Sequence, residues 1–422
     1  MRVTNGATYR NFTTGANSVH AQLIKSYNKV SSGEAYEKAS DSPLNYYNSQ
    51  KIDSRYQDVI GKQALIKDVQ NRIYQQELGA RDVQSILSKA KDQIIYANTD
   101  TTNDTPLLSL RDDLLQKEHE IVNALNMQYQ NFYVFGGNDI STPPFALSGD
   151  GTTITYTHTF PGASKPTTFE MKLEETKPYP DADPTEYGFS LKVTTPDNTT
   201  FEYDPKNPPA DPTDPNDQGN QAQALLLKAM KEQGRMDVGY GSIRDHDTLI
   251  DTYTGGVNLL TGLTSDAVKG GAGNLCSKDA AGNPLATDSS GKSIMDYLNE
   301  SPLALISRSV QAIDKYVGDA DNPDRDRTEL NHLLSQTITD MVTTEHRVSA
   351  VYSDLGNKYR LLEDTTDKLS LEKNNLTEQY TDVWGADPYE AIVEMYNSQQ
   401  AYNAALKVGT NLMSSSLFDF MR

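Results

Sequence analysis

A seven-residue hydrophobic repeat runs through residues 52–94. The apolar side chains that fall on it without a miss are Ile52, Val59, Ile66, Ile73, Ala80, Leu87 and Ile94. A second column on the same face holds Val69, Val83 and Ala90. Spacing of seven places side chains on one stripe of a helix and favours a left-handed supercoil with a partner helix. The pattern predicts a helix of roughly 64 Å at 1.5 Å per residue, weakened locally by Gly61 and Gly79.

The same repeat returns near the other end of the chain. Its members are Leu334, Met341, Val348, Leu355, Leu362, Leu369, Leu376 and Val383. Companion positions are filled by Ile338, Tyr352, Tyr359 and Tyr380. No proline occurs between Pro323 and Pro388. We expect a second helix of roughly 75 Å, and we expect residues 52–94 and 334–383 to pair antiparallel.

Three further segments have helical periodicity. Residues 107–130 carry a column of Leu108, Leu115, Val122 and Tyr129, flanked by Leu107, Leu114 and Ile121. Both ends of the chain are also amphipathic. The apolar positions that we expect to pack against partners there are Val19, Leu23, Tyr27, Val30, Ile392, Met395, Tyr402, Leu406 and Met413. A short helix is marginal in water without tertiary contacts, so we expect these end stripes to lack a partner in the isolated chain.

The middle of the chain differs in kind. Residues 141–220 hold 13 of the 19 prolines. Residues 152–157 are β-branched and aromatic, and residues 189–193 alternate between apolar and polar side chains, so both are predicted strands. A short helix is expected at about 221–232, after a Pro/Asp-rich linker. Residues 141–300 carry 12 basic and 23 acidic side chains, a net −11 of the chain's −20.

These patterns predict a mainly α fold. N- and C-terminal arms form an elongated helical rod, and a β-containing (α+β) domain is inserted between them. The expected segments are an N-terminal assembly helix (1–44), N-terminal rod helices (45–140), the inserted variable domain (141–300), C-terminal rod helices (301–388) and a C-terminal assembly helix (389–422).

Composition narrows the function. A net charge of −20 disfavours nucleic acid and anionic lipid, which attract basic surfaces. The single cysteine, Cys276, cannot form an internal disulfide. The sequence contains no apolar run of signal-peptide or membrane-span length. Alone, these features favour the cytoplasm, although a chain exported without a cleaved signal would look the same.

A search for reactive groups predicts no catalytic, cofactor-binding or metal-ligating residues. None of the six histidines has metal-ligand spacing such as H-E-x-x-H. The tight acid–histidine cluster at residues 244–247 is interpreted as a solvated loop. Residues 211–217 offer oxygen ligands but lack calcium-loop spacing, so they are interpreted as a linker. The pattern indicates a structural protein rather than an enzyme.

Specific motifs at both ends resemble the flagellin-like family. Residues 23–43 contain a Ser31-Ser32-Gly33 turn and a Ser-Asp-Ser-Pro restart that ends at Pro43. Glycine suits a left-handed helix C-cap, and proline suits the first position of a helix. The aromatic run at residues 131–137, the Pro-Phe at 144–145 and the closing segment 396–420 are similar to the hook–filament junction members of that family.

The resemblance implies an extracellular structural subunit, exported through the flagellar type III channel without a cleaved signal. It implies self-assembly into a ring between the first hook-associated protein and flagellin, with an export chaperone as a further partner. One alternative is a filament subunit, that is, a flagellin proper. A second alternative, from another class, is a cytoplasmic coiled-coil scaffold.

Overall fold

The structure is a computed structural model that describes residues 5–99, 104–137, 141–149, 151–178, 181–182, 184–211, 214, 216–231, 235–237, 249–251, 254–268, 288, 291–318 and 327–420. The chain divides into two compact units. The terminal unit combines Met1–Leu65 with Thr366–Arg422, and the central unit is Ile66–Thr365.

The described helices and strands follow in chain order. The helices are α1 (Asn5–Ser32), α2 (Pro43–Ala97), α3 (Asp104–Leu125), α4 (Gln218–Lys231), α5 (Gly256–Thr261), α6 (Ser265–Val268), α7 (Ile294–Asn299), α8 (Pro302–Gly318), α9 (Arg327–Trp384) and α10 (Pro388–Phe420). The strands are β1 (Gln128–Tyr129), β2 (Phe132–Tyr133), β3 (Phe145–Leu147), β4 (Thr153–His158), β5 (Thr167–Lys177), β6 (Glu186–Thr194), β7 (Thr200–Tyr203), β8 (Arg235–Asp237) and β9 (Leu249–Asp251).

Both predicted long helices form, and their seven-residue columns are buried. All members from Val59 to Ile94 and from Leu334 to Leu376 lie in the core, whereas Ile52 and Val383 are half-buried. The predicted companion column is only half-buried. The buried second column of α9 is instead Thr337, Thr344, Val351 and Thr365. Threonine does not register in a hydrophobicity pattern, but it can be buried here because each hydroxyl donates to a backbone carbonyl: Thr337 to Leu333, Thr365 to Leu361 and Thr344 to Glu300.

Helices α2 and α9 pair antiparallel, as the columns predict. In the central unit, the side-chain amide of Gln84 donates to the Ser349 hydroxyl (2.9 Å), and that of Asn98 donates to the Ser335 hydroxyl (2.9 Å). In the terminal unit, the Gln63 amide donates to the Ser370 hydroxyl (3.0 Å). The residue numbers fall along one helix as they rise along the other. The same kind of amide–serine bond therefore joins the two helices in both units.

The third predicted helix is shorter and rotated relative to the prediction. Helix α3 ends at Leu125 rather than at residue 130. The side chain of Asn126 then bonds the backbone of Phe145 twice, accepting from its N–H (3.0 Å) and donating to its carbonyl (2.7 Å). The positions predicted to flank the stripe are its centre: Leu107, Leu114 and Ile121 are fully buried. Of the predicted column, Val122 is buried, while Leu108, Leu115 and Tyr129 are only half-buried.

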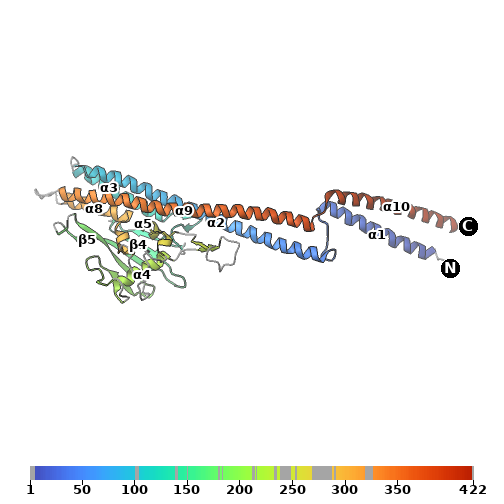
Figure 1. The fold of residues 1–422 in the computed structure, drawn as a ribbon, viewed down its shortest axis with the longest axis horizontal. Coiled ribbons are helices and arrows are strands. Elements are labelled where there is room, and N and C mark those ends of the chain that lie inside the picture. The colour runs from blue at the N-terminus through green and yellow to red at the C-terminus, as the bar shows by residue number, and fades with distance from the viewer. Residues whose placement is uncertain are drawn as a thin grey trace. The chain divides into compact units, whose positions relative to one another are not determined.

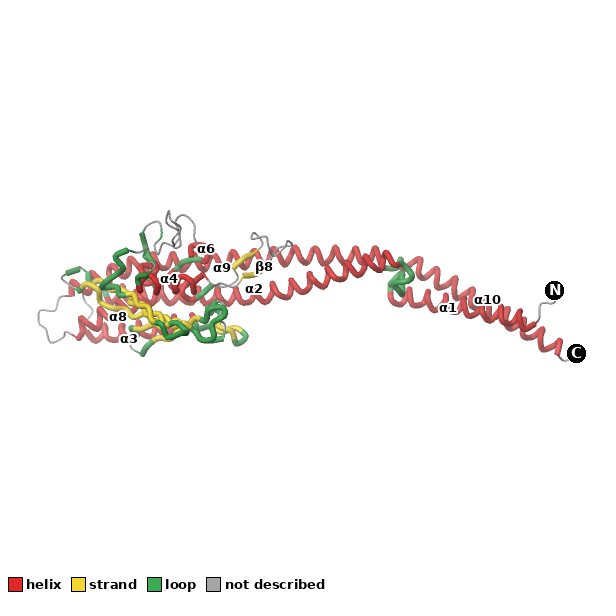
Figure 2. Tube along the Cα trace, turned by 90° about the horizontal axis from the view of Figure 1, so that it is seen from below, coloured by secondary structure: helices red, strands yellow, loops and turns green. Residues whose placement is uncertain are grey.

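Within the central unit, α3 and α8 pack side by side along the α2–α9 pair (Figure 1). Figure 2 shows the same neighbours from below. Arg308 ties α8 to α9 through Asp340 at 2.8 Å, and Lys91 ties α2 to α9 through Glu345 at 2.6 Å. These four helices therefore pack together in this unit.

The inserted region forms an antiparallel sheet of order β3-β4-β5-β6-β7. The predicted strands at 152–157 and 189–193 correspond to β4 and β6, and the predicted short helix corresponds to α4. Phe169, Met171 and Leu191 alternate into a core that also receives α4, α7 and α8. The mainly α fold class with an inserted β-containing region is confirmed. The five sequence-derived segments remain a prediction about organisation.

Candidate assembly surface

The first and last helices pack against each other in the terminal unit (Figure 1). Lys29 Nζ lies 2.9 Å from Glu394 Oε2, and the rings of His20 and Tyr402 lie 5.1 Å apart. A Cβ on Gly409 would lie 2.5 Å from the Phe12 ring, so the helices approach closely there. The expectation that the end stripes lack any partner in the single chain is therefore wrong: α1 and α10 cover part of each other.

The predicted packing residues divide between two environments. Val19, Leu23, Met395 and Tyr402 are half-buried. Among the residues of α1 and α10 whose burial is described, the buried ones are Ser26, Ala391 and Gly409. Tyr27, Val30, Ile392 and Leu406 are exposed. Met413 lies in α10, but its side chain is outside the described residues. Sequence periodicity found the stripes but missed the small residues Ser26, Ala391 and Gly409, which are not hydrophobic enough to register.

A second apolar face remains exposed on the α1–α10 pair. We call it the outer apolar face and define it as Ile24, Tyr27, Val30, Ile392, Val393 and Tyr396. The Lys29–Glu394 and His20–Tyr402 contacts place these six residues at the same level of the antiparallel pair. Their side chains are between 37% and 63% exposed.

Exposed apolar groups are concentrated in the terminal unit as a whole. Of 22 large apolar side chains exposed in the described part of the chain, 16 lie in this unit. The other six are Tyr74, Ile95, Tyr96, Phe132, Val342 and Leu361. The buried apolar side chains in the terminal unit are Val59, Leu369, Leu376, Trp384 and Ala391. The unit exposes more large apolar side chains than it buries, so it is the candidate interaction surface of the described chain.

Two turns hold the base of the α1–α10 pair. Gly33 ends α1 with a φ of +73°, as its sequence predicts. The Ala386 N–H donates to the Gly33 carbonyl (2.9 Å), and the Ala35 N–H donates to the Trp384 carbonyl (2.8 Å). The Trp384 ring lies 5.3 Å from that of Tyr36. The two turns therefore form one hydrogen-bonded joint.

Asp41 organises the turn before α2. Partial desolvation alone would raise the pKa of Asp41, but N–H donors from Glu37 and Lys38 and the nearby Lys25 ammonium hold that pKa below its usual value. Lys25 Nζ lies 3.4 Å from Asp41 Oδ1. Pro43 then opens α2. The Ser-Asp-Ser-Pro motif thus works locally as a helix restart.

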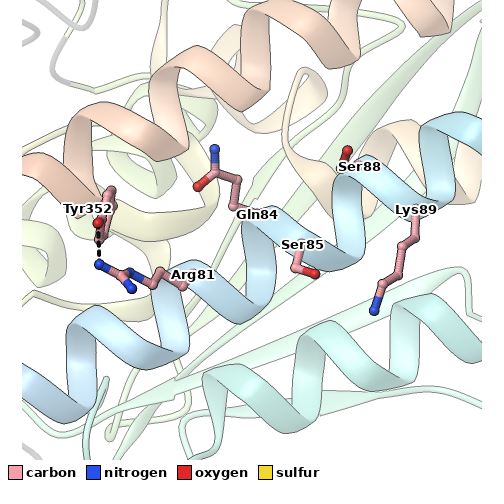
Figure 3. Close-up of a pocket in the computed structure, with 6 residues that line it drawn as sticks. All are labelled: Arg81, Gln84, Ser85, Ser88, Lys89 and Tyr352. Atoms are coloured by element: carbon pink, nitrogen blue, oxygen red, sulfur yellow. Dashed lines mark hydrogen bonds between the residues drawn. The ribbon is translucent and has the colours of Figure 1, made fainter.

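The described residues were searched for a catalytic groove, a metal site and a membrane-spanning helix. A groove of about 500 Å³ lies on α2 and α9. The six residues that line it, labelled in Figure 3, are Arg81, Gln84, Ser85, Ser88, Lys89 and Tyr352. These six side chains include no carboxylate or imidazole to act as a general base. In the part of the chain that the structure describes, no three His, Cys, Asp or Glu side chains gather as a metal site, and no helix is long and apolar enough to cross a membrane.

Three further sequence interpretations concern the acid–histidine cluster, the cysteine and the linker. The cluster at 244–247 and Cys276 lie outside the described residues. In the predicted linker, Asp217 caps α4 by accepting from the Gly219 N–H (2.8 Å).

Comparison with known proteins supports the resemblance seen in the motifs. Residues 3–139 match the family model of the bacterial flagellin N-terminal helical region. Residues 3–139 are therefore similar to the N-terminal helical region of bacterial flagellins. No curated protein sequence matches the chain.

Several solved structures are similar to this one. A protein of Vibrio parahaemolyticus, assigned as a flagellar hook-associated protein, has a TM-score of 0.44 and 12% identity, over 82% of this chain and 100% of its own. FlgL of Xanthomonas campestris has a TM-score of 0.38 and 11% identity, over 78% of this chain and 99% of its own.

Proposed function

We propose that this chain forms the adaptor layer between hook and filament in the bacterial flagellum. The observation that carries the proposal is the excess of exposed apolar side chains in the terminal unit, 16 of 22 among the described residues. Assembly into a ring buries this surface between copies and against neighbouring flagellar subunits. The proposal assigns the chain no catalytic activity.

Energetics require that many of these residues act together. Fully burying one large apolar side chain contributes about 1.5–3 kcal/mol. Association costs about 4–15 kcal/mol in lost freedom. One contact cannot offset that cost. The eight side chains of the outer apolar face with Leu406 and Val408 are each about half-exposed, so burying them together contributes about 6–12 kcal/mol, which falls within that range. The pairing of α1 with α10 lowers the cost further, because part of each helix is already ordered.

The position within the flagellum rests on sequence motifs. The aromatic segment 131–137 and the closing segment 396–420 are similar to junction proteins rather than to filament subunits. The partners are then the first hook-associated protein below, flagellin above, and a chaperone during export. Export without a cleaved signal would place the protein outside the cell.

A filament subunit is the second candidate. The match of residues 3–139 to the flagellin N-terminal region is the observation behind it, because that match fits a filament subunit as well as an adaptor. Copy number in purified flagella separates the two candidates. An adaptor is a minor component, whereas a filament subunit dominates by mass.

Truncation after Trp384 tests the proposal in cells. The truncated chain lacks α10, so the platform for the first filament layer is lost. We expect cells to build hooks and to shed flagellin into the medium. Normal filaments on these cells would contradict the proposal.

Point variants test the same surface without removing a helix. Val393→Asp and Tyr396→Asp place charge on the outer apolar face, and we expect both to release flagellin. Asn403→Asp is the matched control, since Asn403 is an exposed polar residue of the same helix, and it should leave filaments intact.

A further inference from the structure

The aromatic segment forms a tight hairpin with an unusual turn. Strands β1 and β2 pair Gln128 with Tyr133 and Tyr129 with Phe132. The two turn residues have left-handed backbones, with φ of +49° at Gln130 and +67° at Asn131. Two successive residues with positive φ are typical of a type I′ turn, whose twist matches that of the paired strands. Asparagine tolerates this conformation, whereas glutamine rarely adopts it, so the backbone at Gln130 is strained.

The base of this hairpin is fixed to α2. Phe135 is fully buried, and a Cβ on Gly79 would lie 2.6 Å from its ring, so only glycine lets the ring sit there. The buried Gln76 amide donates to the carbonyls of Val134 (2.6 Å) and Thr254 (3.0 Å), and its oxygen accepts from the Thr254 N–H (3.1 Å). These contacts fix the residues that follow β2 to α2, so the hairpin is anchored at its base.

The tip is exposed, aromatic and uncharged. The Phe132 side chain is 44% exposed. Gln130 and Asn131 are also exposed. Residues 121–138 contain no Asp, Glu, Lys, Arg or His, in a chain whose net charge is −20. Copies of so acidic a chain repel one another. An uncharged projection is where two copies can meet at the smallest electrostatic cost.

We propose that the hairpin tip, Tyr129–Phe132, is a contact surface for a second copy of this chain. The inference rests on the proposed assembly but concerns the central unit instead of the terminal helices. Phe132 inserts into the second copy as an apolar anchor. The turn places its side chain at the exposed end of the hairpin. Aromatic anchors of this kind contribute strongly to interfaces between proteins.

Photo-crosslinking tests this contact directly. The full chain is made with p-benzoylphenylalanine in place of Phe132, and assembled from a mixture of isotopically light and heavy copies. We expect mixed light–heavy crosslinked peptides, which only two different copies can yield. The matched control carries the same group in place of Thr199. Thr199 lies on another exposed hairpin turn, where Asn198 has a φ of +61°. It should crosslink at least ten-fold less.

A charged variant gives a second readout. Phe132→Asp should raise the concentration needed for assembly at least ten-fold, whereas Thr199→Asp should not change it. If copies assemble but position 132 crosslinks no better than position 199, the hairpin contact is wrong and the proposed function survives. If the full chain assembles under no condition and adds to no hook, both proposals fail.

Discussion

Leu361 and Leu362 are neighbours in α9 that lie in opposite environments. Leu362 is fully buried on the seven-residue column, while Leu361 is 42% exposed. Composition and local propensity are the same at both positions, so only the period of the pattern separates them. The pair therefore tests whether the column is a core seam.

We expect Leu362→Asp to destabilise the central unit by about 4 kcal/mol, because it removes a buried side chain and buries an unpaired charge. Leu361→Asp should cost less than about 0.5 kcal/mol, since the new charge stays in water. Thermal unfolding followed by circular dichroism measures both. Equal melting temperatures would show that the column is not core.

At the scale of elements, Gln76 joins three segments that are distant in sequence. It lies on α2 and bonds the hairpin at Val134 and the returning chain at Thr254. The Gly256 N–H also donates to the Phe135 carbonyl (3.0 Å). Both chain segments that flank the inserted sheet region thus meet on one helix face.

Gln76→Ala should cost about 3 kcal/mol, because it leaves buried backbone groups of Val134 and Thr254 without this partner. Amide hydrogen exchange over residues 128–135 should become faster. The adjacent Gln75 is half-buried, and Gln75→Ala serves as the control, with little effect expected. Matching stability losses in the two variants would rule out the role that we give to Gln76.

Elements with a strong period could be predicted from the sequence, and elements defined by tertiary contacts could not. The columns of α2 and α9 need only a count of seven. The pattern locates helix α3 but predicts its end and its central stripe wrongly, because both of its columns are apolar and only packing chooses between them. Nothing local shows that Asn126 ends α3 by bonding Phe145. The Gln76 contacts are equally invisible, since a glutamine within an amphipathic helix looks like a surface residue.

The candidate surface was predicted in part for the same reason. Periodicity identified α1 and α10 as amphipathic. It could not distinguish side chains that face the partner helix, such as Leu23, from side chains that face outward, such as Tyr27. That distinction depends on the pairing register, which the Lys29–Glu394 contact shows.

At the scale of the whole molecule, charge and exposed apolar surface are unevenly distributed. Residues 141–300 carry more than half of the net negative charge. Most of the exposed large apolar side chains lie in the terminal unit. The negative charge of residues 141–300 makes copies repel one another, while the terminal unit exposes apolar surface. Both properties suit a subunit that stays soluble until its terminal helices bind partners.

Immuno-gold labelling of isolated flagella tests the proposed adaptor role most directly. Antibodies raised against residues 141–300 recognise the region least likely to be shared with other flagellin-like subunits, because it lies outside the matched segment 3–139. The account predicts a single narrow band of label where the hook meets the filament. Label distributed along the whole filament, or absent from flagella altogether, would contradict it.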